Sequence, residues 1–462
     1  MISFIDDRKI NAILAKAGSA SASAASAIID KALGLKGLAP EEAAVLLQCD
    51  SPAVVGKLFK AARRIKETIY GKRLVIFAPL YVTNICVNNC LYCGFRCTNK
   101  LLERKRLSLE EIKEEVTILE RQGHKRILLE AGEDPKGDIN YLEKAIKTIY
   151  ATKYKNGEIR RLNVNAPAMS VKDFKRLKKS KIGTYQLFQE TYHRGTYEKM
   201  HLSGPKSDYL YHLFAMHRAQ EAGIDDVGIG VLFGLHDYRF EVLALLYHAL
   251  ELEKQFGVGP HTISVPRIEP AVNSPLTVKP PAPVSDNDFK KLVAILRLAV
   301  PYTGLILSTR ESAKMRNEVI GLGISQISAG SSTVPGGYKK SLKKSSAGGQ
   351  FSISDNRTLA EVIHDISKLG YSPSFCTACY RLGRVGADFM DMAKPGLIKN
   401  FCLPNSLLTF KEYLLDYGNE KAKKLGKAVI KAHLKDIPSS AIRKQTIGKL
   451  KTIEQGQRDL YF

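Results

Sequence analysis

Eight short apolar segments alternate with helical patterns between residues 74 and 328 of this chain. Neighbouring parallel strands need a crossover of a dozen or more residues, usually a helix. Eight such units over about 260 residues are typical of a closed barrel. We therefore predict an α/β fold of the TIM-type (β/α)8 class, and a doubly wound open sheet is the alternative. The predicted strands are residues 74–83, 126–130, 162–165, 184–189, 227–233, 262–265, 304–308 and 324–328.

The helical patterns divide the chain into three regions. Ser108 with Glu111 forms a capping box at the start of a helix in the barrel region, and Thr358 with Glu361 forms a second capping box at the start of a helix beyond it. We expect an N-terminal helical extension, the barrel and a mainly helical C-terminal domain. These regions cover residues 1–70, 71–340 and 341–462. The predicted barrel helices are residues 108–122, 141–150, 171–179, 208–221, 241–255 and 286–300, and residues 336–349 are predicted to be a loop or linker.

The charge balance is strongly basic but does not by itself indicate a nucleic-acid-binding protein. Lys and Arg number 70 against 46 Asp and Glu, which gives a formal net charge of +24. The lysines are spread widely, and we find no recognition helix, zinc finger or aromatic RNA-binding motif. The densest stretch, residues 421–451, holds ten Lys or Arg and one acid, Asp436. It predicts a solvated helical face or, alternatively, a docking site for an acidic electron donor.

The sequence favours a cytoplasmic protein. It has no run of about 18 uncharged apolar residues, so we expect no membrane span. The Ser- and Ala-rich residues 19–27 are flanked by acids, which transit peptides avoid. Seven of the eight cysteines fall into two tight groups. Clustered thiols in a long chain of this kind indicate metal binding.

The first cysteine group, Cys86, Cys90 and Cys93, has the spacing C-x3-C-x2-C directly after the first predicted strand. Three thiolates can hold three irons of a 4Fe–4S cluster and leave the fourth iron open. With Tyr92 before the last cysteine, the loop resembles that of radical S-adenosylmethionine (SAM) enzymes. This implies that the open iron binds SAM, whose reductive cleavage starts radical chemistry. A zinc site is the alternative.

Further SAM contacts are predicted where other strands end. Ala131-Gly132-Glu133 follows the second strand. It resembles a Gly-Gly-Glu motif whose backbone meets the methionine amino group, with Ala in the first position here. An ordinary loop is the alternative. Asn165, Glu190 and Arg218 are candidates for ribose and carboxylate contacts, and each could instead be structural.

The second cysteine group is Cys376 and Cys379, followed after 22 residues by Cys402. A closed zinc site would need a fourth ligand. Three thiolates therefore indicate an auxiliary iron–sulfur cluster with an open iron, and zinc with a distant His is the alternative.

The sequence around both groups resembles the HydG family of radical SAM tyrosine lyases, which mature the active-site cluster of [FeFe]-hydrogenase. The resemblance extends over most of the chain from about residue 40. It is carried by residues 86–95, 188–197, 261–270, 307–311, 376–384 and 392–405.

The resemblance implies cleavage of L-tyrosine at Cα–Cβ to p-cresol and dehydroglycine. Dehydroglycine would yield CO and cyanide, collected as an Fe(CO)2(CN) unit at an auxiliary cluster that carries an additional iron. Reduced ferredoxin or flavodoxin is the expected electron donor, and other hydrogenase maturation proteins are expected partners. A tyrosine lyase of thiamine thiazole synthesis, with a shorter C-terminal part, is the nearest alternative. A zinc-stabilised nucleic-acid-binding protein is an alternative from another class.

Substrate contacts are predicted from the barrel geometry. Arg310 and Arg267 follow the seventh and sixth strands, and barrel enzymes bind substrates at the C-terminal ends of strands. Either guanidinium could hold the tyrosine carboxylate, and Ser308 is a lesser candidate. His261 precedes the sixth strand, at the opposite mouth, and the resemblance implies that it ligates the additional iron. The two mouths should lie on the order of 20 Å apart, which predicts a polar passage through the barrel.

Overall fold

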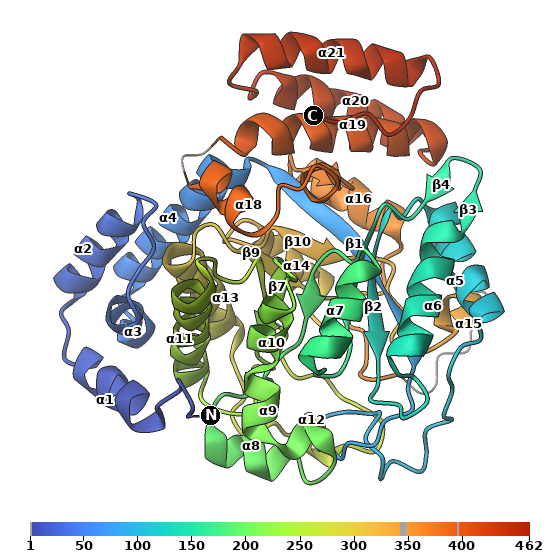
Figure 1. Ribbon diagram of the computed structural model, residues 1–462. Coiled ribbons are helices and arrows are strands. Elements are labelled where there is room, and N and C mark those ends of the chain that lie inside the picture. Colours follow the sequence, from blue (N-terminus) through green and yellow to red (C-terminus); the bar gives the residue numbers. More distant parts are fainter. Residues whose placement is uncertain (1, 342–348, 395–396) are drawn as a thin grey trace.

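A closed barrel of eight parallel strands forms the centre of the computed structural model, which describes residues 2–341, 349–394 and 397–462 (Figure 1). The strand order is β10-β9-β8-β7-β6-β5-β2-β1, and pairing of β1 with β10 closes the barrel. The predicted (β/α)8 class is confirmed, and the open sheet is excluded. The strands are β1 (Arg73–Thr83), β2 (Arg126–Ala131), β5 (Arg161–Asn165), β6 (Tyr185–Gln186), β7 (Val227–Gly230), β8 (Thr262–Ser264), β9 (Gly304–Leu307) and β10 (Gln326–Ser328).

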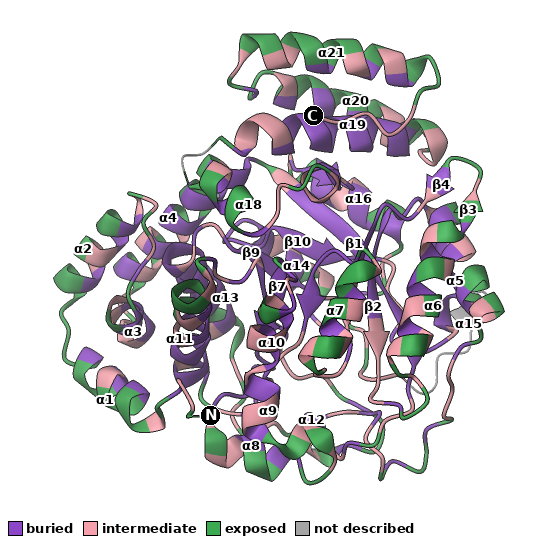
Figure 2. Ribbon diagram, in the orientation of Figure 1, coloured by how far each residue is buried: buried purple, intermediate pink, exposed green. Residues whose placement is uncertain are grey.

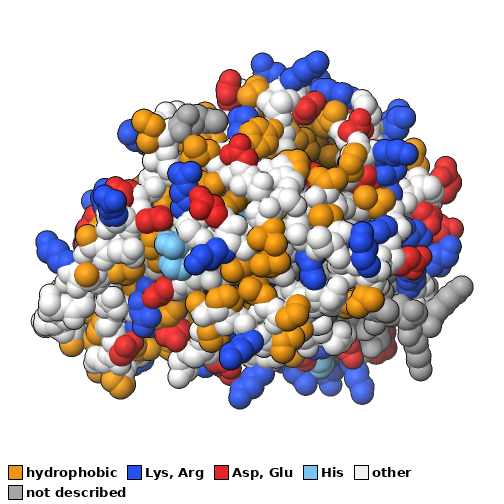
Figure 3. All heavy atoms as spheres, turned by 90° about the horizontal axis from the view of Figure 1, so that it is seen from below, with side chains coloured by type: hydrophobic (Ala, Val, Ile, Leu, Met, Phe, Trp, Pro, Cys, Tyr) orange, Lys and Arg blue, Asp and Glu red, His pale blue; other side chains and the backbone are white. Residues whose placement is uncertain are grey.

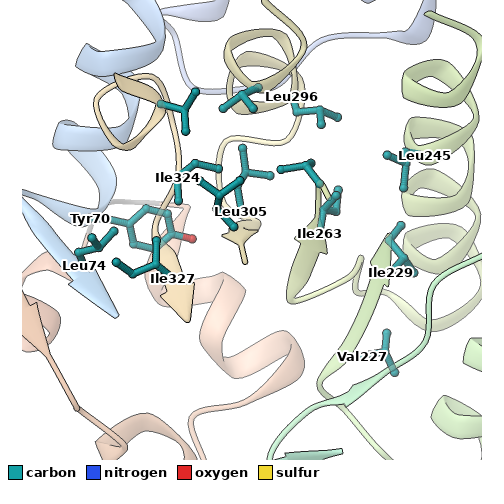
Figure 4. Packing of buried hydrophobic residues seen from close by; sticks show 14 of the residues in the cluster. Tyr70, Leu74, Val227, Ile229, Leu245, Ile263, Leu296, Leu305, Ile324 and Ile327 are labelled. Atoms are coloured by element: carbon teal, nitrogen blue, oxygen red, sulfur yellow. The ribbon is translucent and has the colours of Figure 1, made fainter. Parts of the chain in front are cut away.

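Outward-facing apolar residues of these strands pack against the surrounding helices. Ile263 and Leu305 alternate with the inward-facing Ser264 and Gly304, because successive strand residues point to opposite faces. Figure 4 shows these outward side chains with residues of the covering helices, and Figure 2 shows that the strands are buried. The barrel is therefore packed mainly through its outer face, and its interior holds polar residues together with a small apolar cluster of Phe77, Leu128 and Ile306.

The helices of the barrel layer begin and end close to the predicted positions. Ser108 and Glu111 form the capping box of α5. The predicted helix over residues 208–221 is broken at Phe214, whose ring packs against Phe4 and His217 at centroid distances of 5.4 and 4.7 Å. The elements are α5 (Leu109–Gln122), α6 (Ile139–Ala151), α7 (Val171–Lys179), α8 (Arg194–Met200), α9 (Tyr209–Leu213), α10 (Ala215–Glu221), α11 (Tyr238–Phe256), α12 (Pro275–Val278), α13 (Asp286–Ala299) and α14 (Ala313–Ile320), with the 3-10 turn η1 (Pro205–Ser207) and the hairpin β3 (Lys153–Tyr154) and β4 (Gly157–Glu158).

An N-terminal helical layer packs on one side of the barrel (Figure 1), as predicted. It consists of α1 (Asp7–Ala17), α2 (Ala22–Ala32), α3 (Pro40–Gln48) and α4 (Pro52–Tyr70). Among the described helices, none is by itself long and apolar enough to cross a bilayer; α1 and α2 reach that length and composition only when taken together, and they meet at 115°.

The C-terminal region is mainly helical and covers the N-terminal mouth of the barrel (Figure 1). A short strand joins it to the barrel, because Ser372 and Ser374 pair in parallel with Arg73 and Val75 at the start of β1. This pairing brings Cys376, two residues on, to the N-terminal mouth. The elements are α16 (Leu359–Lys368), β11 (Ser372–Ser374), α17 (Ala378–Arg381), α18 (Gly386–Ala393), α19 (Lys399–Asp416), α20 (Glu420–Leu434) and α21 (Ser440–Glu454).

The loop predicted over residues 336–349 is partly helical. A short helix, α15 (Gly337–Ser341), forms where the Glu115 carboxylate accepts hydrogen bonds from the backbone N–H groups of Tyr338 and Lys339, at 2.9 and 2.8 Å. A carboxylate at a helix N-terminus satisfies donors that have no partner inside the helix. The rest of that predicted loop, residues 342–348, lies outside the described residues.

Candidate functional site

Two adjoining cavities open at the C-terminal mouth of the barrel. One contains all three cysteines of the first group with Gly132 and Glu133, and the other extends into the barrel past Ser308 and Arg310. The cavities share seven lining residues: Tyr92, Cys93, Glu130, Asn165, Phe188, Glu190 and Gln350. A group bound beside the cysteines would therefore face a group bound inside the barrel.

The Cys86–Cys93 loop holds its thiols in a buried environment with N–H donors. The Asn88 amide lies 3.7 Å from Cys86 Sγ, and the Phe95 backbone N–H donates to Cys93 Sγ at 3.4 Å. Burial raises the pKa of the Cys93 thiol to about 11 and also raises the pKa of the Cys90 thiol. Buried sulfurs with nearby N–H donors fit an iron–sulfur cluster, whose binding displaces the thiol protons.

The Gly132-Glu133 pair adjoins this loop. A Cβ atom on Gly132 would lie 2.4 Å from the Ile85 carbonyl oxygen, so only glycine fits there. The Glu133 carboxylate accepts a hydrogen bond from Asn88 Nδ2 at 2.6 Å. Ala131, in the first position of the predicted motif, is the half-buried last residue of β2.

The other predicted SAM contacts are placed differently. Asn165 and Glu190 line both cavities. Arg218 is not among the lining residues; its guanidinium donates to the carbonyls of Met169 and Tyr211, at 2.9 and 2.7 Å. Tyr92 lines both cavities, and its hydroxyl lies 2.8 Å from His201 Nε2.

Two charged residues that sequence reasoning missed line the same space. Lys206 forms an ion pair with Glu190 at 3.0 Å. Glu130 is the last inward residue of β2, and burial raises its pKa to about 8, while Arg310 opposes this shift. Strand alternation could have singled out Glu130, because it lies two residues after the inward Leu128. No sequence signal marks Lys206.

The two candidate arginines have different surroundings. Arg310 lines the inner cavity with its guanidinium 3.3 Å from the centre of the Phe351 ring. Among the described residues, no hydrogen bond or ion pair engages that guanidinium. Arg267 instead donates to both Glu311 oxygens, at 2.7 and 2.5 Å, and to Asp286 at 2.8 Å. Arg310 is therefore the one with free donors for a carboxylate.

A third cavity lies at the N-terminal mouth and contains the second cysteine group with His261. Cys376 follows β11, Cys379 lies in α17 and Cys402 in α19. A hydrogen bond shared by Cys379 and Cys402 lowers the pKa of Cys402 to about 6 and raises the pKa of Cys379. His261 Nδ1 lies 3.5 Å from the Asp226 carboxylate. A histidine that ligates a metal through one ring nitrogen usually has a carboxylate or carbonyl beside its other ring nitrogen.

Three arginines, Arg73, Arg126 and Arg161, line this third cavity beside the thiols. Arg126 is 7% exposed, and the Nε atoms of Arg73 and Arg126 are buried without a hydrogen-bond partner. Buried cations are stable where they face negative charge. The arginines thus fit a cavity that holds thiolates or an anionic cluster.

Neither cysteine group is arranged around a single point. In the ranges 2–341, 349–394 and 397–462, no three His, Cys, Asp or Glu side chains converge as ligands of one ion. Zinc draws its thiolates to about 2.3 Å from one centre, whereas a cluster binds each thiolate at a different iron.

The cavities at the two mouths lie close together inside the barrel. On four strands, one inward residue lines the N-terminal cavity, and the inward residue two positions later lines the C-terminal cavity. Two strand residues span about 6.6 Å. The pairs are Val75 and Phe77, Arg126 and Leu128, Gly304 and Ile306, and Gln326 and Ser328. The two cavities share no lining residue, so an open polar passage remains a prediction.

Comparison with known proteins identifies the family. Residues 80–246 match the radical SAM superfamily, and residues 264–372 match the biotin and thiamin synthesis associated domain. The 2-iminoacetate synthase of Salmonella typhimurium is 30% identical over 347 residues, which cover 75% of this chain and 89% of that protein.

Two solved structures resemble the whole chain. The crystal structure of HydG, a maturase of the [FeFe]-hydrogenase, is 58% identical with a TM-score of 0.97 and covers 100% of both chains. The HydG maturase from Carboxydothermus hydrogenoformans is 43% identical with a TM-score of 0.84, covering 96% of this chain and 97% of that one. The chain belongs to the HydG family of radical SAM enzymes.

Proposed function

We propose that the chain is a maturase of [FeFe]-hydrogenase that cleaves L-tyrosine at Cα–Cβ to p-cresol and dehydroglycine. It then releases CO and cyanide from dehydroglycine and delivers them as an Fe(CO)2(CN) unit. The observation that carries this proposal is the pair of cysteine-containing cavities at opposite mouths of one barrel. One cavity suits the start of radical chemistry, and the other suits the collection of its products.

At the C-terminal mouth, Cys86, Cys90 and Cys93 hold a 4Fe–4S cluster, and the Gly132-Glu133 segment receives SAM. The reduced cluster with bound SAM supplies a carbon-centred radical. The chain surrounds it with Asn165 and Glu190, which line both cavities, and keeps Tyr92 fixed through its hydrogen bond to His201. These residues position the cofactor and exclude solvent.

Tyrosine binds in the inner cavity. Arg310 grips its carboxylate, because a guanidinium matches two carboxylate oxygens. Ser308 adds a hydroxyl at the same strand end. The apolar side chains of Phe77, Leu128 and Ile306 form a buried cluster in the floor of the cavity and can contact the aromatic ring. The carboxylate and the aromatic ring of tyrosine are thereby held at opposite ends of the inner cavity.

At the N-terminal mouth, Cys376, Cys379 and Cys402 hold the auxiliary iron–sulfur cluster, and His261 ligates its additional iron. The Asp226 carboxylate orients the His261 ring through Nδ1. A neutral imidazole is a suitable iron ligand, and burial lowers the pKa of His261, which favours the neutral form.

The alternative function of dehydroglycine supply for thiamine synthesis rests on the similarity to 2-iminoacetate synthase. The second cysteine group and the full-length similarity to HydG favour hydrogenase maturation. Reduced ferredoxin or flavodoxin as donor, other maturation proteins as partners, and a cytoplasmic location form part of the same proposal.

The test uses anaerobically reconstituted, reduced protein with SAM and L-tyrosine. We expect p-cresol, CO and cyanide, and iron with sulfide in amounts that fit two clusters. Production of p-cresol without CO would support the thiamine alternative. Zinc without sulfide would refute the radical mechanism.

A further inference from the structure

We propose that the surface around the Cys86–Cys93 loop docks a small acidic electron-carrier protein, and that the basic C-terminal helices are not its docking site. The inference rests on the proposed function, in which the cluster at this loop must receive an electron. It opposes the alternative interpretation of the charge pattern, which places the donor on residues 421–451.

Exposed apolar side chains surround the loop. Leu101 is 73% exposed, Leu202 55% and Val278 75%, and Val87 and Val272 are also exposed. We call these five residues the mouth patch. Figure 3 views this face from below and shows hydrophobic side chains in its middle, with Lys and Arg beside them. Apolar side chains exposed near one another often mark a protein interaction site.

The mouth patch is attached directly to the cluster loop. The Leu202 N–H donates to the Asn89 carbonyl at 3.2 Å, and Asn99 Nδ2 donates to the Val272 carbonyl at 3.1 Å. The Leu91 N–H donates to the Met200 carbonyl at 3.0 Å, just before His201 and Leu202. A protein seated on the patch would therefore contact the segment that carries Cys90 and Cys93.

The charges around the patch select an acidic partner. Lys100, Lys199 and Lys279 are exposed, and among the described residues none has an ion-pair partner. Among the neighbouring acids, Glu198 pairs with Arg194 at 3.2 Å and Glu103 pairs with Lys340 at 3.7 Å. The exposed Asp208 has no ion-pair partner among the described residues, so three unpaired lysines stand against this one exposed acid. Complementary charge speeds the encounter of two proteins, and transient electron-transfer complexes need less than about 1,200 Å² of interface.

The C-terminal helices lie at the wrong end of the barrel for this role. They cover the N-terminal mouth, where β11 pairs with the first residues of β1. Cys86 follows the other end of β1, which spans 11 residues, or about 36 Å. A donor docked on α20 or α21 would face the auxiliary cavity, with the barrel between it and the first cluster.

The experiment compares two triple variants of the reconstituted enzyme. One reverses charge at the mouth (Lys100→Glu, Lys199→Glu and Lys279→Glu). The matched control reverses three exposed lysines of the C-terminal helices (Lys424→Glu, Lys431→Glu and Lys444→Glu). Formation of 5′-deoxyadenosine is measured against the concentration of a reduced acidic ferredoxin. It is also measured with photoreduced 5-deazariboflavin, a small neutral reductant that needs no docking.

We expect the mouth variant to lose at least about tenfold in its rate per unit ferredoxin at low salt, because steering contributes roughly 10- to 1,000-fold. The loss should shrink as salt screens the charges. Its rate with deazaflavin and its iron content should match the wild type, and the control should behave as wild type with both reductants. Leu202→Asp, which adds an acid to the mouth patch, should repeat the ferredoxin loss if the triple variant does not fold.

A ferredoxin loss in the C-terminal control, with the mouth variant unaffected, would overturn the inference. Equal ferredoxin rates in all variants would overturn it as well. Failure of the proposed function is distinguishable, because the wild type would then form no 5′-deoxyadenosine even with deazaflavin.

Discussion

Arg310 and Arg267 should respond in opposite ways to replacement by Met. Arg310→Met removes a guanidinium that lines the inner cavity and that no carboxylate of the described residues engages. A hydrogen bond to a charged group contributes about 1.5–3 kcal/mol. Since about 1.4 kcal/mol corresponds to a factor of ten, kcat/KM for tyrosine should fall roughly 10- to 150-fold. Stability should not fall, because a buried charge is removed.

Arg267→Met should instead act on the fold. It leaves the Glu311 carboxylate, whose side chain is 2% exposed, without its bidentate partner. Removal of one member of a buried ion pair costs about 3–5 kcal/mol. The affinity for tyrosine should change little in the protein that remains folded.

The assay pairs a tyrosine titration of p-cresol formation with thermal unfolding of both variants followed by circular dichroism. A tyrosine KM unchanged in Arg310→Met would refute its role in carboxylate binding. If a stably folded Arg267→Met variant binds tyrosine more weakly, Arg267 and not Arg310 binds the tyrosine carboxylate.

Three further predictions concern the separate roles of the two cysteine groups and the anchoring of the C-terminal region. Replacing the three cysteines of the first group by Ala should abolish 5′-deoxyadenosine and p-cresol together, and chromatography of both products checks this. Replacing Cys376 and Cys379 by Ala should leave most p-cresol formation and reduce CO much more, as measured by CO trapping; equal loss of both products in folded protein would contradict separate sites. Arg160→Met should lower the free energy of unfolding by about 3–5 kcal/mol, because it removes the ion-pair partner that lies 2.8 Å from the 3%-exposed Glu412 of α19. A denaturant titration measures this loss, and an unchanged free energy of unfolding would show that the ion pair does not stabilise the fold.

The barrel could be predicted from the sequence because each strand carries an apolar outer face that alternates with its inner face. Ile263 is typical: it lies between the smaller residues Thr262 and Ser264, which face the interior. Local capping signals such as Ser108 with Glu111 placed helix starts equally well. These features depend on neighbouring residues in the chain.

Contacts between distant segments could not be predicted in this way. The helix α15 depends on Glu115, more than 200 residues earlier, and Lys206 reaches the cavity from a short turn. The pairing of β11 with β1 is also long-range, and it decides which mouth receives Cys376. Arg267 and Arg310 look equivalent in sequence, and the ion pairs of Arg267 with Glu311 and Asp286 distinguish them in the structure.

The passage between the two cavities can be tested at Gly304. This inward residue lines the N-terminal cavity, and a Cβ atom there would lie 2.8 Å from Gln326 Nε2 and 3.3 Å from the His261 carbonyl. Ile306, the next inward residue of β9, lines the tyrosine cavity. Because only about 6.6 Å separates two such positions, a side chain at residue 304 would stand between the cavities without contact with tyrosine.

Gly304→Val should therefore leave p-cresol formation near the wild-type level and reduce CO and cyanide, since dehydroglycine can no longer cross. Gly304→Ala, which adds a single methyl group, should show a smaller loss and serves as the control. Iron and sulfide analysis must find both clusters in each variant, because this separates a blocked passage from a damaged auxiliary site. If Gly304→Val retains both clusters and makes CO as fast as the wild type, dehydroglycine does not travel past β9. The small residues of the barrel interior would then need another explanation.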